Sequence, residues 1–165
     1  MDMVIGFMEE DHVLYCGDAA RDIIPPVCSL IEQHHNANSP VIFVCDSHDP
    51  DDLEFEIFPK HCIKGTEEAE LIHELHEYDG YHLPKRRYSA FFDTDLDKRL
   101  SELNTETVTI CGVCTDICVM HTAADARNRD YKVNVYADGV ASFDLDAHRI
   151  ALKHMEDILG VRVIR

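Results

Sequence analysis

The stretch "CGVCTDICVM" at residues 111–120 holds three of the seven cysteines of the chain, in two different chemical settings. Cys111 and Cys114 have the Cys-x-x-Cys spacing found in redox pairs and in half of a zinc site. Cys118 falls in the first turn of a helix expected at about 117–129. Unpaired N–H groups there favour a thiolate and can stabilise an oxyanion. The ordinary alternative is a buried cysteine that only packs.

The redox or zinc interpretation of Cys111 and Cys114 lacks supporting features. Cys111 ends the apolar run "TVTICGV" (107–113), and the helical pattern begins only after Thr115. A second Cys-x-x-Cys that would complete a structural zinc site is absent from the sequence. We therefore expect both cysteines to pack, with a backbone role for Cys114 left open, and we take Cys118 as the candidate nucleophile.

The segment "CDSHDPDDLEFEIFPKHC" (45–62) contains groups that bind metals. Asp46 and His48 stand two apart in an extended segment, so their side chains point to the same side. With His61 they form a donor set suited to a divalent transition metal, and Glu54 is a further candidate ligand, directly or through water. The alternative is a solvated loop with chance histidines, because the chain contains 11 of them. Spacing alone leaves both possibilities open.

A basic cluster stands out in the acidic chain, within "LPKRRYSAFFDTDLDKRL" (83–100). Lys85 ends an expected strand, where an ammonium can bind a carboxylate or polarise an oxyanion. Arg86 and Arg87 are expected to be surface residues.

Strand and helix patterns alternate along the chain and must position these groups. Continuous apolar runs predict strands at 40–46, 107–113, 132–139 and 161–164, with a further strand at 80–85. Helices are predicted at 26–36, after Thr66, after Thr94, at about 117–129 and at about 145–159. This order predicts a three-layer α/β/α fold, Rossmann-like, around a mostly parallel sheet, with ligands at the carboxyl ends of the strands.

Length and composition restrict the class of protein. A chain of 165 residues, 45% apolar and 28% charged, predicts one soluble domain over 1–165. The formal charge of −17 repels phosphate backbones, which argues against nucleic-acid binding. Neither an apolar run of roughly 18 residues nor a signal-peptide pattern is visible, so we expect no membrane segment. An odd number of cysteines without a framework is typical of free thiols in a cytoplasmic protein.

The three stretches together resemble the isochorismatase-like cysteine hydrolases, and within them the nicotinamidases, over nearly the whole chain. "GVCTDICVMHTAADA" is similar to the nucleophile segment and "KRRYSAFFDTDL" to the lysine segment, which implies Lys85 as the catalytic lysine. "DSH" followed by "FPKHC" is similar to the metal segment. This implies Asp46, His48 and His61 as ligands, with Glu54 a ligand in some members. The implied ion is zinc, with iron or manganese as alternatives.

The resemblance also implies a catalytic aspartate at the end of a first strand. "DMVIGF" places it at Asp2 and an aromatic pocket residue at Phe7. Phe58 stands where many nicotinamidases have Trp, and Tyr88 is a further pocket residue. Only Met1 precedes Asp2, and by resemblance the first strand lies in the middle of the sheet. We therefore expect the first strand to be truncated in this chain.

The activity implied is hydrolysis of nicotinamide to nicotinate and ammonia through a thioester, a step of pyridine nucleotide salvage. Asp2 would take the proton of Cys118, and Lys85 would keep Asp2 ionised. Backbone N–H groups of Cys114 and Cys118 would hold the oxyanion, after a cis peptide at Val113–Cys114. The metal would orient the pyridine ring. A small-molecule amide is thus the expected partner, and we expect the chain to associate with copies of itself. The alternatives are another cysteine amidohydrolase acting on a carbamoyl or ureido compound, or a non-catalytic metal-binding homologue.

Overall fold

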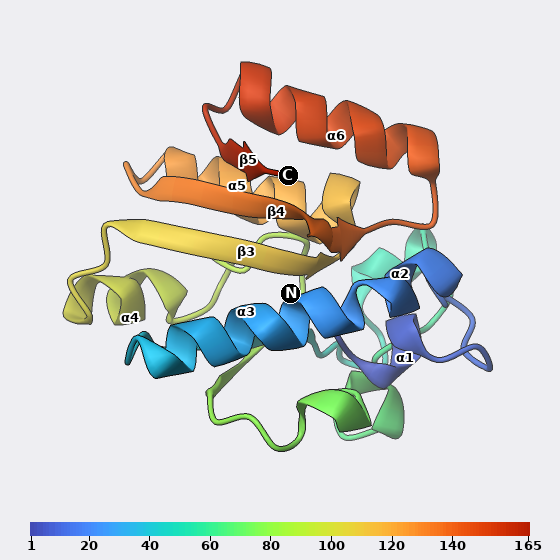
Figure 1. Ribbon diagram of the computed structural model, residues 1–165. Helices are drawn as coiled ribbons and strands as arrows, with labels where there is room; N and C mark the ends of the chain where they lie inside the picture. Colours follow the sequence, from blue (N-terminus) through green and yellow to red (C-terminus); the bar gives the residue numbers. More distant parts are fainter.

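The computed structural model describes residues 1–165 as a mixed α/β fold with two parallel sheets (Figure 1). In the first sheet, β1 (Ile42–Asp46) pairs with β2 (Tyr81–Lys85). In the second, the order is β3 (Thr107–Val113), β4 (Lys132–Ala141) and β5 (Arg162–Ile164). Every pairing within the two sheets is parallel, which confirms the predicted fold class.

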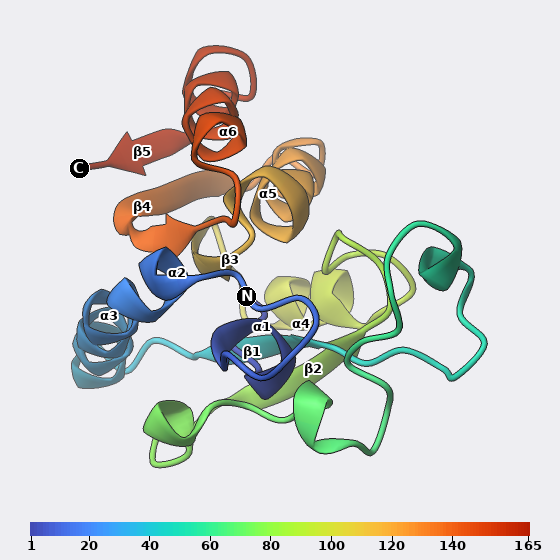
Figure 2. The same cartoon turned by 90° about the vertical axis from the view of Figure 1, so that its right-hand side faces the viewer.

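Helices cover both faces of the strands, as Figure 2 shows from the side. One layer contains α1 (Ile5–Met8), α2 (Asp18–Asp22) and α3 (Ile24–Asn36), and the other contains α4 (Leu96–Glu102), α5 (Met120–Arg127) and α6 (Leu145–Asp157). Short turns of 3-10 helix lie at Leu53–Glu56, Glu67–Ala69 and His73–Leu75, and a π-helical turn lies at Thr115–Val119.

Strand β1 shows why the strands read as continuous apolar runs. Successive side chains of a strand point to opposite faces. Phe43 and Cys45 join a core cluster that includes Val27 of α3, whereas Val44 joins another that includes Leu100 of α4. Because both faces are covered, every position of the strand before Asp46 is apolar.

Two predicted helices differ in detail from the structure. The segment after Thr66 forms only the 3-10 turn Glu67–Ala69, and the Thr66 hydroxyl donates to the carbonyl of Ile63 (2.7 Å) instead of capping a helix. The helix predicted at 117–129 begins with the π-helical turn Thr115–Val119 and continues as α5. Cys118 therefore lies in a π turn, two residues before the regular helix begins at Met120.

The beginning of the chain contains no strand of its own. Met1 and Asp2 lie between β1 and β3, and Asp2 has a positive φ of 52°. Val4 forms an antiparallel bridge with Leu71, and α1 begins at Ile5.

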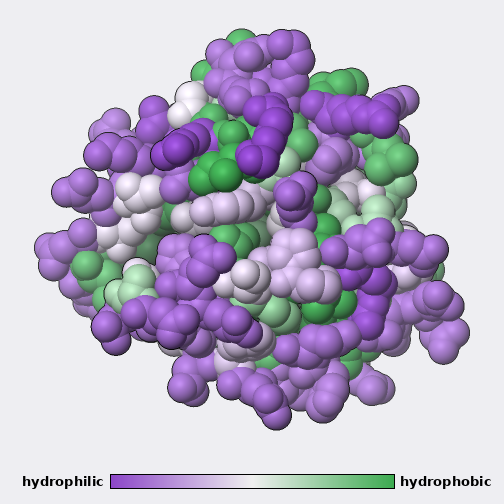
Figure 3. Space-filling model, in the orientation of Figure 1, coloured by the Kyte–Doolittle hydropathy of each residue, from purple (hydrophilic) through white to green (hydrophobic).

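The surface is mostly hydrophilic. Figure 3 shows charged and polar residues over much of one face, with pale and hydrophobic residues across its middle. This agrees with the formal charge of −17. No helix is long and apolar enough to cross a membrane.

Candidate active site and metal centre

The first two residues connect the two sheets and place Asp2 at their carboxyl ends. The Met1 ammonium donates to the carbonyl of Cys111 (2.8 Å), and the Met1 carbonyl accepts from the N–H of Val113 (3.0 Å). The N–H of Asp2 donates to the carbonyl of Val44 (2.8 Å), and the Asp2 side chain is fully buried. Asp2 is therefore held by backbone bonds from β1 and β3 together.

Gly112 permits this close approach of the chain start. Its φ is +110°, a conformation that side chains other than glycine rarely adopt. A Cβ at Gly112 would also collide with the carbonyl oxygen of Met1. The glycine is thus required both by its own backbone conformation and by the position of Met1.

Three predicted catalytic side chains meet in one buried cluster. Lys85, at the end of β2, places its Nζ 2.9 Å from Oδ2 of Asp2 and 3.5 Å from Sγ of Cys118. The same ammonium contacts a carboxylate oxygen of Asp46, the last residue of β1. The reactive atoms of Asp2, Asp46 and Cys118 lie within 4.8 Å of one another. A single ammonium is therefore shared by two carboxylates and a thiol.

Burial in this cluster favours the neutral thiol form of Cys118. Burial raises the pKa of Cys118 well above its ordinary value, and Lys85 only partly offsets this. Burial and the charge of Asp46 also raise the pKa of Asp2. Burial favours the neutral amine of Lys85, but Asp2 and Asp46 outweigh it and raise the Lys85 pKa. The helix start predicted to favour a thiolate does not dominate, so the nucleophile needs a base beside it.

The predicted metal ligands also meet. One ligand atom from each of Asp46, His48 and His61 lies within 4.8 Å of the others, and all three residues are buried. Nε2 of His48 has no hydrogen-bond partner, nor does Oε2 of Glu54. Nδ1 of His61 lies 2.8 Å from the carbonyl of Pro59, which leaves Nε2 free. Unpartnered buried nitrogen and oxygen atoms around one point fit a divalent transition metal.

Protonation of these groups differs from residue to residue. Burial opposes ionisation of Asp46, but Lys85 and His48 hold its pKa at about 2. Burial lowers the pKa of His61, which keeps a lone pair on the ring. Burial and the charge of Asp46 raise the pKa of Glu54. An anionic Asp46 and a neutral His61 are the forms that bind a metal.

Arg87 makes a partly buried ion pair beside the candidate ligands that the sequence analysis missed. It was predicted to be a surface residue, yet its Nη1 lies 2.6 Å from Oδ1 of Asp52. Oδ2 of Asp52 lies 3.4 Å from Nδ1 of His48, so the carboxylate links the guanidinium to the imidazole. Arg86 behaves as predicted and pairs with Asp93 at the surface. The prediction for Arg87 was wrong because its partner lies 35 residues away in sequence.

A small cavity of about 40 Å³ lies between the cluster and the candidate ligands. The predicted pocket residues Phe7, Phe58 and Tyr88 all line it, together with Cys118. The analysis of the sequence did not identify Phe143, which lines the cavity and is half exposed. A larger cavity of about 370 Å³ lies elsewhere, between β1 and β3.

The segment before Cys118 has the predicted backbone form. The Val113–Cys114 peptide is cis, and no backbone carbonyl accepts from the N–H of Cys114. Cys111 and Cys114 are both free thiols, as expected. The Cys114 sulfur lies 3.4 Å from that of Cys16, a neighbour that sequence spacing did not suggest.

Comparison with known proteins places this geometry in a family. Residues 1–164 match the family described as "Isochorismatase domain". The uncharacterized isochorismatase family protein PncA of Bacillus subtilis is 37% identical, covering 99% of this chain and 95% of that protein. An Arabidopsis thaliana protein named "Probable inactive nicotinamidase" is 33% identical, covering 98% of this chain and 88% of its own length.

Solved structures agree with the same fold. A crystal structure titled nicotinamidase PncA from Bacillus subtilis has a TM-score of 0.93 and 37% identity, covering 99% and 96% of the two chains. An N-carbamoylsarcosine amidase from Thermoplasma acidophilum has a TM-score of 0.90 and 36% identity, covering 99% of this chain and 92% of that chain. A pyrazinamidase of Pyrococcus horikoshii in complex with zinc has a TM-score of 0.91 and 29% identity, covering 99% of this chain and 95% of that chain. From the match over residues 1–164 and these similarities, the chain belongs to the isochorismatase domain family.

Proposed function

We propose that the chain is a metal-containing cysteine amidohydrolase that converts nicotinamide to nicotinate and ammonia. The observation that carries the proposal is the buried contact of Lys85 with Asp2 and Cys118, directly beside the candidate ligands Asp46 and His48. This arrangement puts a base, a nucleophile and a cation within reach of one carbonyl group.

In the first half of the reaction, Asp2 takes the proton of the Cys118 thiol as the sulfur attacks the carboxamide carbon. Lys85 stays within 3.5 Å of the sulfur and stabilises the negative charge that develops there. Backbone N–H groups of Cys114 and Cys118 donate to the oxyanion. Asp2 then returns the proton to the leaving nitrogen, ammonia departs, and a thioester on Cys118 remains.

In the second half, water replaces ammonia next to Asp2. The carboxylate accepts a proton from the water, which attacks the thioester carbon. The oxyanion collapses, and the Cys118 sulfur takes back the proton held by Asp2. Nicotinic acid leaves and ionises to nicotinate, and its proton is taken up by ammonia in solution. Each carboxylate and thiol returns to its starting form, so no further co-reactant is needed.

Asp46, His48 and His61 would hold a divalent ion, for which we propose zinc, with Glu54 as a further ligand. When bound, such an ion supplies a Lewis acid that can orient the pyridine nitrogen of the substrate. Phe7 and the other aromatic side chains of the cavity would stack on the ring.

The alternative substrate class is a carbamoyl or ureido amide, supported by the likeness to N-carbamoylsarcosine amidase. The convergent donors of Asp46, His48 and His61 favour the pyridine amide, because a ring nitrogen can bind a metal. The relative named as inactive supports a third possibility, a homologue that binds metal without turnover.

The test is ammonia release from a panel of amides by protein whose metal content is measured by mass spectrometry. We expect nicotinamide and pyrazinamide to be hydrolysed well above N-carbamoylsarcosine and ureas, and one equivalent of metal per chain. Preferred hydrolysis of the carbamoyl compound would support the alternative substrate. Metal binding without any ammonia release would support the non-catalytic homologue.

A further inference from the structure

The thiols of Cys16 and Cys114 lie together in the interior, and the proposed reaction uses neither sulfur. The two sulfur atoms are 3.4 Å apart, although the residues are separated by 98 positions in sequence. The residues are 2% and 7% exposed, and both thiols are free. Among the seven cysteines, these are the only two whose sulfurs form a hydrogen-bonded contact.

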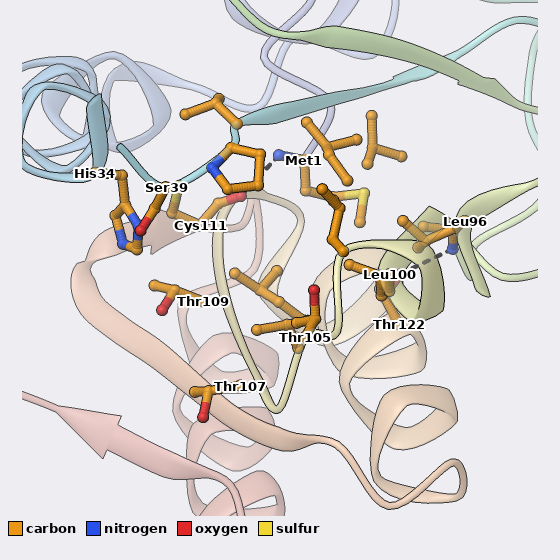
Figure 4. Close-up of a pocket in the computed structure, with 18 of the residues that line it drawn as sticks. Met1, His34, Ser39, Leu96, Leu100, Thr105, Thr107, Thr109, Cys111 and Thr122 are labelled. Atoms are coloured by element: carbon orange, nitrogen blue, oxygen red, sulfur yellow. Dashed lines mark hydrogen bonds between the residues drawn. The ribbon is translucent and has the colours of Figure 1, made fainter. Parts of the chain in front are cut away.

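The Cys-x-x-Cys spacing suggests Cys111 as a redox partner of Cys114, but the two residues line different cavities. Cys111 lies in β3 and lines the larger cavity of about 370 Å³, where Figure 4 shows it beside Met1. Cys114 lines the smaller cavity together with Cys16 and Cys118. The sulfur in position to react with that of Cys114 therefore comes from the segment between α1 and α2.

The smaller cavity gives a small oxidant access to this pair. Its volume of about 40 Å³ exceeds the roughly 10–15 Å³ that one water molecule needs, so hydrogen peroxide fits. Phe143 lines the cavity and is 54% exposed, so the cavity reaches the surface at this side chain. The bond to Cys16 and burial raise the pKa of Cys114, so its thiol is protonated at rest. The first oxidation step is therefore the slow one, and the second is fast because the sulfurs are already in contact.

Oxidation by a peroxide balances without any further reactant. One thiol sulfur attacks the O–O bond of hydrogen peroxide: an S–O bond forms, the O–O bond breaks, and the thiol proton leaves with the departing oxygen as water. The second sulfur attacks the sulfenic acid: an S–S bond forms, the S–O bond breaks, and the second thiol proton leaves as water with the hydroxyl group. The two sulfurs lose one electron each, and the peroxide oxygens take up both.

A bond between these sulfurs would connect two segments of the active site. The carbonyl of Cys114 accepts from the N–H of Val119 (3.1 Å), so Cys114 belongs to the turn that carries Cys118. The N–H of Cys16 donates to the carbonyl of Phe7 (2.9 Å), another residue that lines the cavity. A disulfide bond requires a separation of about 2.0 Å, so the two segments must approach each other. Their approach narrows the cavity between them.

We propose that Cys16 and Cys114 are an oxidative modification site, at which a peroxide forms a reversible disulfide that closes the cavity over Cys118. A dithiol reductant restores both thiols and itself becomes a disulfide. Disulfides in reducing compartments are typically transient and redox-sensing. The loss of amide hydrolysis in the linked form rests on the proposed function, whereas the link itself and the closure over Cys118 do not.

The test treats the chain with graded hydrogen peroxide, blocks the remaining thiols in denaturant, and digests the protein with a protease that cleaves before aspartate. This cleavage separates Cys16 and Cys118 from the peptide 97–115, which contains Cys111 and Cys114. We expect mass spectrometry to find the peptide of Cys16 linked to the peptide 97–115, with fragment ions that place the bond at Cys114.

A second measurement follows access to the nucleophile. Alkylation of Cys118 by chloroacetamide should slow at least tenfold in the linked protein and recover after dithiothreitol, and ammonia release from nicotinamide should fall in proportion to the linked fraction. Cys16→Ser should form no link and, at the same peroxide dose, should keep the alkylation rate that it had before treatment. Cys28→Ser changes a cysteine of α3 outside the cavity and should behave as the parent chain does.

Oxidation of Cys118 while Cys16 and Cys114 remain thiols would overturn the proposal, as would a bond from Cys114 to Cys111 or Cys118. A bond between Cys16 and Cys114 that leaves alkylation of Cys118 unchanged would contradict the closure of the cavity. Slower alkylation of the linked form, in a chain that releases no ammonia even before oxidation, would support this site and refute only the proposed function.

Discussion

Replacing Lys85 by Met removes the cation that Asp2, Asp46 and Cys118 share, while keeping an unbranched side chain. The Lys85 nitrogen lies 3.5 Å from the Cys118 sulfur. At an effective dielectric constant of about 20, one charge pair at that distance is worth about 5 kcal/mol. Without this interaction, the equilibrium constant for forming the Cys118 thiolate falls by a factor of roughly 10³, since about 1.4 kcal/mol corresponds to a tenfold change. We therefore expect kcat for ammonia release from nicotinamide to fall about 10³-fold.

The same substitution should destabilise the metal-free protein at pH 7. Two buried carboxylates, Asp2 and Asp46, would lose their cation, and removing one partner of a buried ion pair typically costs about 3–5 kcal/mol. The free energy of unfolding is measured by urea titration followed by circular dichroism. Lys98→Met, at an exposed lysine, is the matched control and should change stability by less than about 1 kcal/mol.

The loss of folding stability in Lys85→Met should depend on pH in a defined direction. Burial and Asp46 already raise the pKa of Asp2 above its ordinary value, and Lys85 opposes this, so Lys85→Met raises it further. The folded variant then binds more protons than its unfolded chain in the range between the ordinary and the raised pKa. Its stability therefore rises as pH falls through that range and is lost as pH rises.

A double variant separates stability from catalysis. Adding Asp2→Asn to Lys85→Met removes one of the two unpaired carboxylates, so stability at pH 7 should recover by more than half, while turnover should fall below that of Lys85→Met because the base is lost. The reasoning is refuted if Lys85→Met retains turnover within tenfold of the parent chain, or if its stability at pH 7 equals that of Lys98→Met.

Three further substitutions test the surroundings of the site. His48→Ala should lower bound metal below 0.1 equivalents, roughly, and raise KM, as measured by metal analysis and ammonia release; unchanged metal content would remove this residue from the ligand set. Arg87→Met should weaken metal binding about 10–100-fold in a chelator competition, because Arg87 holds the Asp52 carboxylate beside His48. Arg86→Met should leave the metal affinity unchanged. Equal metal affinities of the two variants would contradict the link from Arg87 through Asp52 to His48. Gly112→Ala should lower the free energy of unfolding by more than about 1 kcal/mol, since its Cβ collides with Met1; a neutral effect would show that Met1 does not lie there.

The strands were predictable because burial on both faces leaves a direct pattern in the sequence. The runs at 40–46 and 107–113 contain β1 and β3 with errors of at most two residues. The helix predicted after Thr66 was wrong. A threonine before two glutamates suggests a capped helix, but the Thr66 hydroxyl donates to the carbonyl of Ile63 instead. Local sequence patterns predict the strands better than this helix, because the strands are packed against apolar residues on both faces.

The candidate site was predictable where its residues stand close in sequence. Asp46 and His48 lie at one strand end, so their convergence follows from the period of the strand. The positions of Asp2 and Lys85 against Cys118 came from family resemblance, because those contacts join distant segments. Long-range contacts such as that of Arg87 leave no local pattern. The acidity of Cys118 was misjudged because the helix start is visible in the sequence while the burial is not.

The most direct test of the account is to trap the intermediate on Cys118. The metal-loaded chain is mixed with nicotinamide, quenched in acid within milliseconds, and its peptides are analysed by mass spectrometry. We expect a nicotinoyl thioester on the peptide that contains Cys118, retained in Cys111→Ser, and lost together with ammonia release in Cys118→Ala. Ammonia release by Cys118→Ala, or an acyl group on Cys111 or Cys114 instead, would contradict the assignment of Cys118 as the nucleophile.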